Sequence, residues 1–259
     1  MPILLPSAQA PLAPLSKGTP WADRWAASPL WVAWYALLVF TLAWDFTGLD
    51  MAVMRHIGTP QGFPLKEQWW LSTVFHEYMR LAAQGLFGVM LVWALWPWKQ
   101  SVLPARERRL LVALVLLSLL VVNVVKSSSR TSCPWDLQAF GGTARYVSHW
   151  ALGVRDGGTG RCFPGGHVSS AFAYFALCLP WLQAPAGTLR RTAPGWRWLA
   201  LVLVVGLVAG VTQTLRGAHH PSHSLWTLVI CTGMSMAGWR WAQAWLQRGR
   251  PATAQIGKP

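Results

Sequence analysis

The sequence predicts an all-α fold, a polytopic membrane helical bundle of six transmembrane helices. Hydrophobic residues make up 53% of the 259-residue chain and charged residues only 12%, whereas soluble domains carry about 25% charged residues. Six mainly apolar segments also approach the roughly 20 residues that a helix needs to cross a bilayer. These segments are 29–47, 75–96, 108–126, 167–183, 197–215 and 221–246.

The first apolar segment begins near Leu30 and follows an Ala- and Pro-rich stretch, residues 1–28. This stretch lacks the basic start and the short apolar core of a cleavable signal peptide. We therefore expect 1–28 to be a cytoplasmic tail and the first segment to be an uncleaved anchor.

The later segments differ in quality. Segment 108–126 is the most uniformly apolar, whereas 167–183 is short and interrupted by Pro180. The last three segments are rich in Ala, Gly and Ser, which permit helices to approach closely in lipid. Without an internal repeat, we expect one domain over 29–247, followed by a cytoplasmic tail at 248–259.

Basic residues predict the orientation. They cluster in the loop between the second and third segments, in the loop between the fourth and fifth, and in the C-terminal tail. The positive-inside rule places these parts in the cytoplasm. Loops 48–74, 127–166 and 216–220 then face the periplasm across a bacterial inner membrane.

The net charge of +14 does not indicate a nucleic-acid partner, because the cations lie in short segments between apolar runs. Anionic lipid headgroups and the positive-inside rule account for them better. The predicted outer loop 127–166 is an exception, with Arg130, Arg145, Arg155 and Arg161. We attribute these cations to an anionic substrate.

Histidines mark the same face. All seven lie on or near the predicted outer side, and none lies in a predicted cytoplasmic loop or at the centre of a span. An ionisable cluster at one membrane face is a functional-site hypothesis. The seven are His56, His76, His149, His167, His219, His220 and His223.

Three polar segments reach this face: KSSSRTSCP (126–134), CFPGGHVSS (162–170) and QTLRGAHHPSH (213–223). Lys126 and Arg130 offer fixed positive charge near the headgroups. Gly165 and Gly166 let backbone N–H groups approach an anion at a helix N-terminus. His167, next to them, could then donate a proton.

His219 and His223 are four residues apart, so on a helical reading one could orient the other. One imidazole as nucleophile and another as acid would suffice for phosphoryl transfer. We find no metal-ligand set and expect no cofactor.

Together, in this order, the three segments resemble the signature of the type-2 phosphatidic acid phosphatase and vanadium haloperoxidase superfamily. Its pattern is Lys-x6-Arg-Pro, then Pro-Ser-Gly-His, then Ser-Arg-x5-His-x3-Asp. Lys126 and Pro134 match the first motif, but Cys133 stands in place of its arginine. In the second, His167 matches the histidine and Gly165 replaces the serine.

In the third motif the resemblance makes His219 the nucleophile. His223 then stands in place of the orienting aspartate and Gln213 in place of the arginine, whose charge Arg216 could deliver. An alternative alignment makes His223 the nucleophile, with Thr227 in the aspartate position. The missing carboxylate could come from elsewhere on the outer side, from Asp45, Glu77 or Asp136.

Cys133 and Cys162 lie in the outer loop, each beside a motif. A disulfide between them is plausible if this loop is periplasmic, and two free thiols are the alternative.

The resemblance implies an integral membrane lipid phosphatase or phosphotransferase that works through a phosphohistidine, with its active site at the periplasmic face. Implied substrates are undecaprenyl pyrophosphate, phosphatidate-type lipids or lipid A phosphates. The departures at Cys133, Gln213 and His223 leave an alternative open, a catalytically divergent phosphate-lipid-binding protein or transporter. A haem-binding electron carrier fits less well, because its paired histidines would face each other within the spans.

Overall fold

A computed structural model describes residues 28–184 and 190–248. Apart from Ser28 and Arg248, the predicted tails at 1–28 and 248–259 lie outside the described residues. Every regular element in the described part is helical, which confirms the all-α prediction. The division into one domain and two tails stays a prediction.

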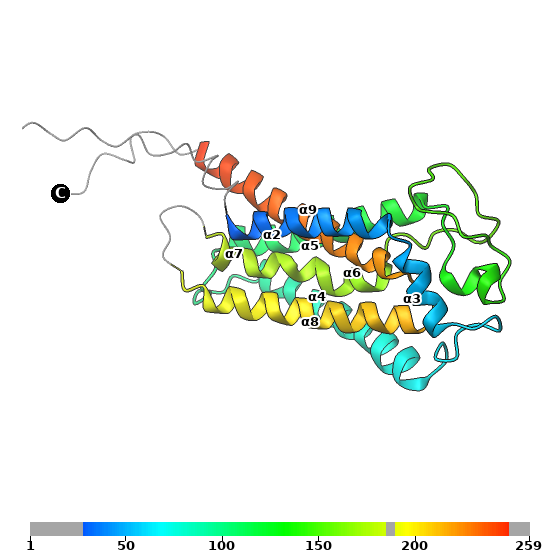
Figure 1. The fold of residues 1–259 in the computed structure, drawn as a ribbon. Coiled ribbons are helices and arrows are strands. Elements are labelled where there is room, and N and C mark those ends of the chain that lie inside the picture. The colour runs from blue at the N-terminus through cyan, green and yellow to red at the C-terminus, as the bar shows by residue number, and fades with distance from the viewer. Residues whose placement is uncertain (1–27, 185–189, 249–259) are drawn as a thin grey trace, which may run out of the picture.

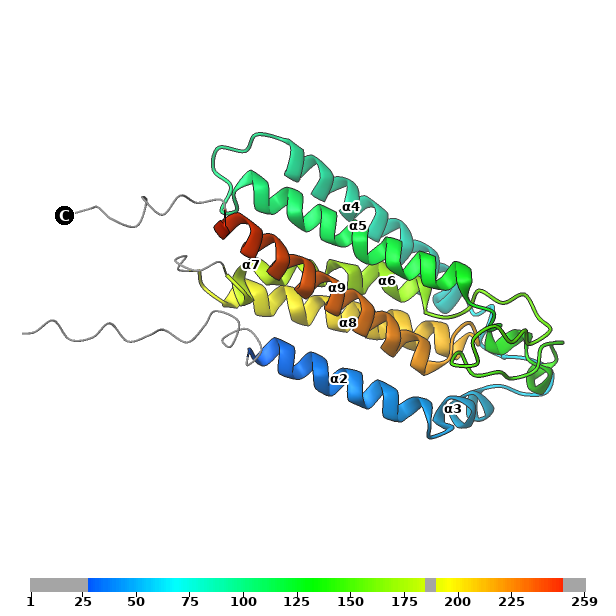
Figure 2. The same cartoon turned by 90° about the horizontal axis from the view of Figure 1, so that it is seen from above.

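The long helices lie lengthwise side by side and alternate in direction along the chain (Figures 1 and 2). The segment from α6 runs through the 3-10 turn η4 into α7. The bundle elements are α2 (Pro29–Asp45), α4 (Met79–Leu95), α5 (Ala105–Ser128), α6 (Gly166–Phe172), η4 (Ala173–Cys178), α7 (Leu179–Leu182), α8 (Ala193–Leu215) and α9 (Pro221–Arg248).

Shorter elements cover one end of this bundle. Helix α3 (Leu49–Ile57) follows α2 after a sharp bend, and the π-helix η1 (Trp70–Tyr78) leads directly into α4. The long loop between α5 and α6 holds two 3-10 turns, η2 (Pro134–Asp136) and η3 (Gln138–Phe140).

Three helical stretches in the described residues are long and apolar enough to cross a membrane: Trp70–Leu95, Ala105–Ser128 and Ala193–Leu215. A fourth is added if α2 and α3, bent by 71°, form one broken span. The short segment α6–η4–α7 changes its hydrogen-bond pattern just before Pro180, and α9 carries polar residues along its length. The total of six spans therefore stays a prediction.

Glycines allow close packing where the sequence predicted it. A Cβ on Gly206 of α8 would lie 2.0 Å from the ring of Phe172 in α6. A Cβ on Gly233 of α9 would lie 2.9 Å from the ring of Trp34 in α2. No side chain fits at either position without displacing these rings, so the glycines set how near the helices lie.

The loops that follow α3 and α5 meet at the end of the bundle where α9 begins, on the right of Figure 1. The rings of Phe63 and Phe140 pack 4.8 Å apart between these loops. Asp50 of α3 accepts hydrogen bonds from the backbone N–H (3.0 Å) and the hydroxyl of Ser222, in the first turn of α9. Loops 48–74, 127–166 and 216–220 thus share one end, as expected.

Candidate active site

A cavity of about 550 Å³ opens at this end of the bundle. Three cations and three imidazoles line it, and no carboxylate does among the residues that the structure describes. Such a lining favours an anionic ligand. The charged and imidazole side chains are those of Arg80, Lys126, Arg216, His76, His167 and His219.

Lys126 enters the cavity from the last turn of α5. Its Cδ and Cε atoms lie 3.4 Å from the point that a Cβ on Gly166 would occupy. Gly166 begins α6, so the absence of its side chain leaves a path for the lysine across the helix N-terminus. The first and second motifs are therefore in contact where Lys126 packs over Gly166.

Gly165 has a different position from the one expected. Its N–H donates to the backbone oxygen of His223 (3.1 Å), and its own carbonyl oxygen accepts from the Thr227 hydroxyl (3.0 Å). Gly165 does not line the cavity. The expectation that its N–H binds an anion is wrong, because that donor already joins the second motif to α9.

His167 lies in the first turn of α6, and its ring lies against that of His76, with centroids 3.8 Å apart and planes inclined by 37°. The hydroxyls of Ser169 and Ser170 donate to the backbone oxygens of Gly166 and His167, each at 2.6 Å. Both serines line the cavity and extend its polar surface past the histidine.

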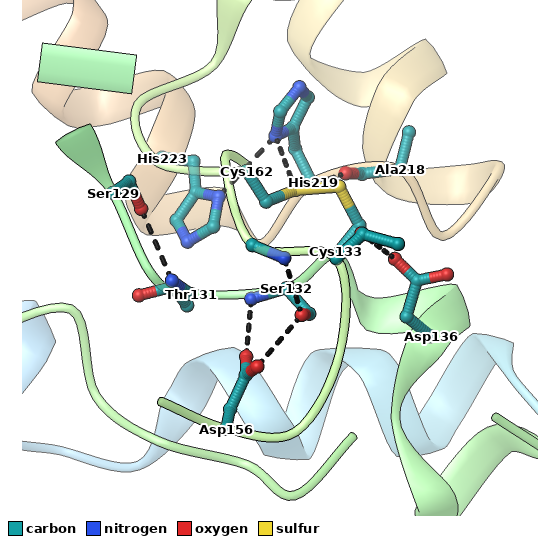
Figure 3. Close-up of a disulfide and its surroundings, with 12 residues drawn as sticks. Ser129, Thr131, Ser132, Cys133, Asp136, Asp156, Cys162, Ala218, His219 and His223 are labelled. Atoms are coloured by element: carbon teal, nitrogen blue, oxygen red, sulfur yellow. Dashed lines mark hydrogen bonds between the residues drawn. A yellow bond between two sulfur atoms is a disulfide. The ribbon is translucent and has the colours of Figure 1, made fainter. Parts of the chain in front are cut away.

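His219 lies just before α9, and its Nδ1 is 3.4 Å from the Nδ1 of His223 and 3.4 Å from the Sγ of Cys162 (Figure 3). Within the described part of the chain its Nε2 forms no hydrogen bond, and His219 lines the cavity. His223 is buried behind it. His219 thus has one nitrogen held by its neighbours and one available for chemistry.

Burial holds the pKa of His219 well below its ordinary value of 6.5, and the nearby charge of Lys126 lowers it further. The imidazole is therefore neutral at neutral pH, which is the form that a nucleophile requires.

Cys133 and Cys162 form a disulfide, with Cα atoms 5.1 Å apart, directly beneath His219 (Figure 3). The backbone joins the same segments, since Cys162 N–H donates to the Thr131 oxygen and Trp135 N–H to the Gly217 oxygen, both at 2.9 Å. The disulfide links the first motif to the second, and the Trp135 bond links the first to the third.

Asp156 organises the loop that carries the disulfide, a role that was not anticipated. Its buried carboxylate accepts from the backbone N–H (2.5 Å) and the hydroxyl (2.9 Å) of Ser132 (Figure 3). It also accepts from the N–H of Gly158 (3.0 Å). The Asp-Gly-Gly sequence at 156–158 is typical of such a turn, but it does not identify Ser132 as the partner.

Two buried donors near the C-terminal end of α8 have no acceptor among the residues that the structure describes. Gln213 is 1% exposed and its Nε2 has no hydrogen-bond partner. Arg216 donates from Nε to the Lys66 oxygen (3.0 Å), while its Nη1 is buried without a partner. Buried unpaired donors are unfavourable, and both residues line the cavity. A ligand with several acceptor oxygens would satisfy them.

Arg130 does not join these residues. It lines a separate cavity of about 690 Å³ in the loop, together with Arg155 and Arg161. The expectation that it binds phosphate beside Lys126 is wrong for this cavity, because Arg130 lies past the end of α5 at Ser128, in the loop that lines the second cavity.

None of the three carboxylates considered from the sequence bonds to His219 or His223. Asp45 accepts from Trp226 (2.8 Å) and contacts His149 (3.2 Å). Asp136 accepts from Thr159, and Glu77 contacts His76. His223 itself therefore fills the position beside His219.

Four lining residues had not been singled out. Arg80 and Gln84 follow His76 at intervals of four, a spacing that places all three on one helix face and could have indicated them. Asn123 lies one turn before Lys126, and Trp135 belongs to η2.

A family model described as the PAP2 superfamily matches residues 108–247. This range is more than half of the chain and contains all three motifs, but it leaves out η1 and α4. No curated protein and no solved structure matches the chain.

Proposed function

Because this chain belongs to the PAP2 superfamily, we propose that it is an integral membrane phosphatase, or phosphotransferase, acting on a lipid phosphate or pyrophosphate. The observation that carries this proposal is a pair of buried donors, Gln213 Nε2 and Arg216 Nη1, for which the described part of the chain offers no acceptor. They share a cationic cavity with Lys126 and His219. A phosphate group offers the negative charge and the acceptor oxygens that this cavity lacks.

The geometry supports nucleophilic catalysis by His219. Its free Nε2 attacks phosphorus, so an N–P bond forms while the bond from phosphorus to the leaving oxygen breaks. His167 gives its proton to that oxygen. Water, or the hydroxyl or phosphate of a second lipid, then loses a proton to His167 and attacks phosphorus. The N–P bond breaks, and His219 is regenerated.

Charge stabilises both steps. Lys126, Arg216 and Gln213 donate to the non-bridging oxygens of phosphorus, where negative charge is spread in the transition state. A bound phosphate would place negative charge beside His167 and so favour the protonated form that acts as the acid. Substrate binding thereby prepares the acid.

An apolar groove supports a lipid substrate. It has a volume of about 300 Å³, lies between α4, α6 and α8, and shares Ser170 with the polar cavity. A phosphate in the cavity would leave a hydrocarbon chain free to follow this groove. Undecaprenyl pyrophosphate, phosphatidate-type lipids and lipid A phosphates fit this description, at the periplasmic face of a bacterial inner membrane.

The second candidate is a protein that binds a phosphate lipid without turnover, as a divergent member or a transporter. The observation that favours it is the replacement of two motif arginines, by Cys133 in the disulfide and by uncharged Gln213.

The test is phosphate release by the purified full-length protein in detergent across a panel of lipid phosphates. His219→Ala and His167→Ala should lose release, whereas His56→Ala, at an exposed position on α3, should keep it. Wild type should also trap an acid-labile, alkali-stable phosphoenzyme from ³²P-labelled substrate. Vanadate binding with neither release nor transfer would favour the second candidate instead.

A further inference from the structure

One wall of the cavity comes from outside the segment that matches the family. Arg80 in the first turns of α4 and His76 in η1 both line the cavity, and both precede residue 108. The three motifs therefore do not account for this wall.

The motifs also leave the cavity short of guanidinium groups. The first motif has Cys133 and the third has Gln213 in the positions where the family pattern has arginine. Arg80, which precedes all three motifs along the chain, brings a guanidinium to the same cavity. It lines this cavity together with Lys126 and Arg216.

Arg80 is held loosely enough to take a ligand. Its Nη2 lies 2.7 Å from Glu77 Oε2, and both side chains are nearly half exposed. Exposed ion pairs of this kind contribute about 0–1 kcal/mol. A guanidinium has five N–H donors, so Arg80 can keep Glu77 and still donate to phosphate oxygens.

His76 is held more firmly. Its Nδ1 lies 3.0 Å from Glu77 Oε1, which fixes a proton on that nitrogen. Its ring lies against that of His167, with centroids 3.8 Å apart and planes inclined by 37°. Glu77 therefore orients both Arg80 and His76, and His76 limits how the His167 ring can turn.

We propose that Arg80 is a phosphate-binding residue that replaces the arginines absent from the motifs, and that His76, held by Glu77, is a positioning residue for His167. This inference rests on the proposed function, since it concerns the same phosphate and the same acid.

The Arg80 arm compares wild type, Arg80→Gln and Arg80→Lys as full-length proteins, with Arg55→Gln as a matched exposed control on α3. Binding of orthovanadate and of inorganic phosphate is measured by calorimetry. KM is measured with the lipid phosphate from which wild type releases phosphate fastest. Arg80→Gln should weaken the binding of both anions and raise KM about tenfold or more. Arg80→Lys should have a smaller effect on binding and KM, and Arg55→Gln should change neither.

The His76 arm separates positioning from folding. His76→Ala should lower kcat about tenfold with KM within twofold of wild type, whereas His76→Phe, which keeps a ring against His167, should keep most of kcat. Melting temperatures of both variants should stay close to that of wild type.

The outcomes distinguish this inference from the proposed function. If wild type binds vanadate but neither releases nor transfers phosphate, the proposed function fails, and the binding arm still tests Arg80. If wild type turns over while Arg80→Gln binds vanadate as tightly as wild type, or His76→Ala keeps the wild-type kcat, the inference is overturned.

Discussion

The Nδ1 atoms of His219 and His223 lie 3.4 Å apart in a buried environment, and only one of them can donate to the other. If His219 is the nucleophile, its Nε2 needs a lone pair and its Nδ1 must carry the proton. His223 Nδ1 must then accept that proton's hydrogen bond. His223 can thus fix the tautomer as a carboxylate would, but it adds no negative charge to stabilise an imidazolium.

Replacing His223 by Leu should therefore lower kcat roughly 10²- to 10⁴-fold, because the reactive tautomer of His219 is no longer selected. His56→Leu on the exposed side of α3 serves as the control. Wild-type kcat in His223→Leu would show that the contact between the two rings has no role in the reaction.

Gly166→Ala tests the path of Lys126. The added methyl would lie 3.4 Å from Lys126 Cδ and Cε, at the edge of ordinary van der Waals contact, so the lysine side chain needs to move by at most a few tenths of an ångström. We expect kcat/KM to fall by no more than about threefold, because a small displacement of a phosphate-binding group weakens its contacts in a preorganised site. Gly88→Ala in α4 has nothing within 4 Å of its new Cβ and should keep kcat/KM unchanged.

Gln213→Leu should separate stability from binding. Removing a buried donor without an acceptor should raise the melting temperature of the ligand-free protein, because the penalty for an unpaired group is about 1–3 kcal/mol. The same change should weaken vanadate binding. A lower melting temperature together with unchanged vanadate affinity would contradict the assignment of Gln213 to the phosphate site.

The pH dependence follows from the lowered pKa of His219, which burial and the Lys126 charge produce. The acid limb of kcat/KM should lie below pH 6.5, since His219 stays neutral through that value. In the unfolded chain the imidazole binds a proton near 6.5, so its contribution to stability is complete above this pH and is lost as the pH falls. The melting temperature should fall less between pH 7.5 and pH 5.5 in His219→Gln than in wild type. An acid limb at or above 6.5 would count against the neutral nucleophile.

The disulfide should stabilise the fold and the site together. It closes a loop with a sequence separation of 29, and the chain-entropy estimate for such a loop is about 3–4 kcal/mol. The double variant Cys133→Ala, Cys162→Ala should unfold at a lower temperature and turn over more slowly, because Cys162 contacts His219. Dithiothreitol should affect wild type and leave the double variant unaltered.

The sequence predicted the long helices well, because apolar length is a local property. Segment 108–126 corresponds to α5 and segment 221–246 to α9. It placed the second segment at 75–96, whereas the helix begins at Trp70, because the tryptophans and polar residues before 75 conceal the start of η1 from a hydropathy pattern.

The motif residues that line the cavity, Lys126, His167 and His219, could be identified because their types and order are distinctive. The sequence did not predict that Arg130 lines a different cavity, because Lys126 and Arg130 belong to one motif although α5 ends between them at Ser128. No spacing rule relates His76 to His167 either, because only the packing of η1 on α6 brings their rings together.

The π-helix η1 makes the direction of the side chains that precede His76 depend on the length of the chain. Each hydrogen bond in a π-helix spans one more residue than in an α-helix, so η1 holds its side chains out of phase with a plain continuation of α4. Deleting one residue from η1 ahead of His76 would let α-helical bonding return. The residues upstream would then be re-aimed by roughly 100° without any change in the chemistry of the site. In this part of the chain, an insertion or deletion can therefore redirect side chains as strongly as a substitution can change their chemistry.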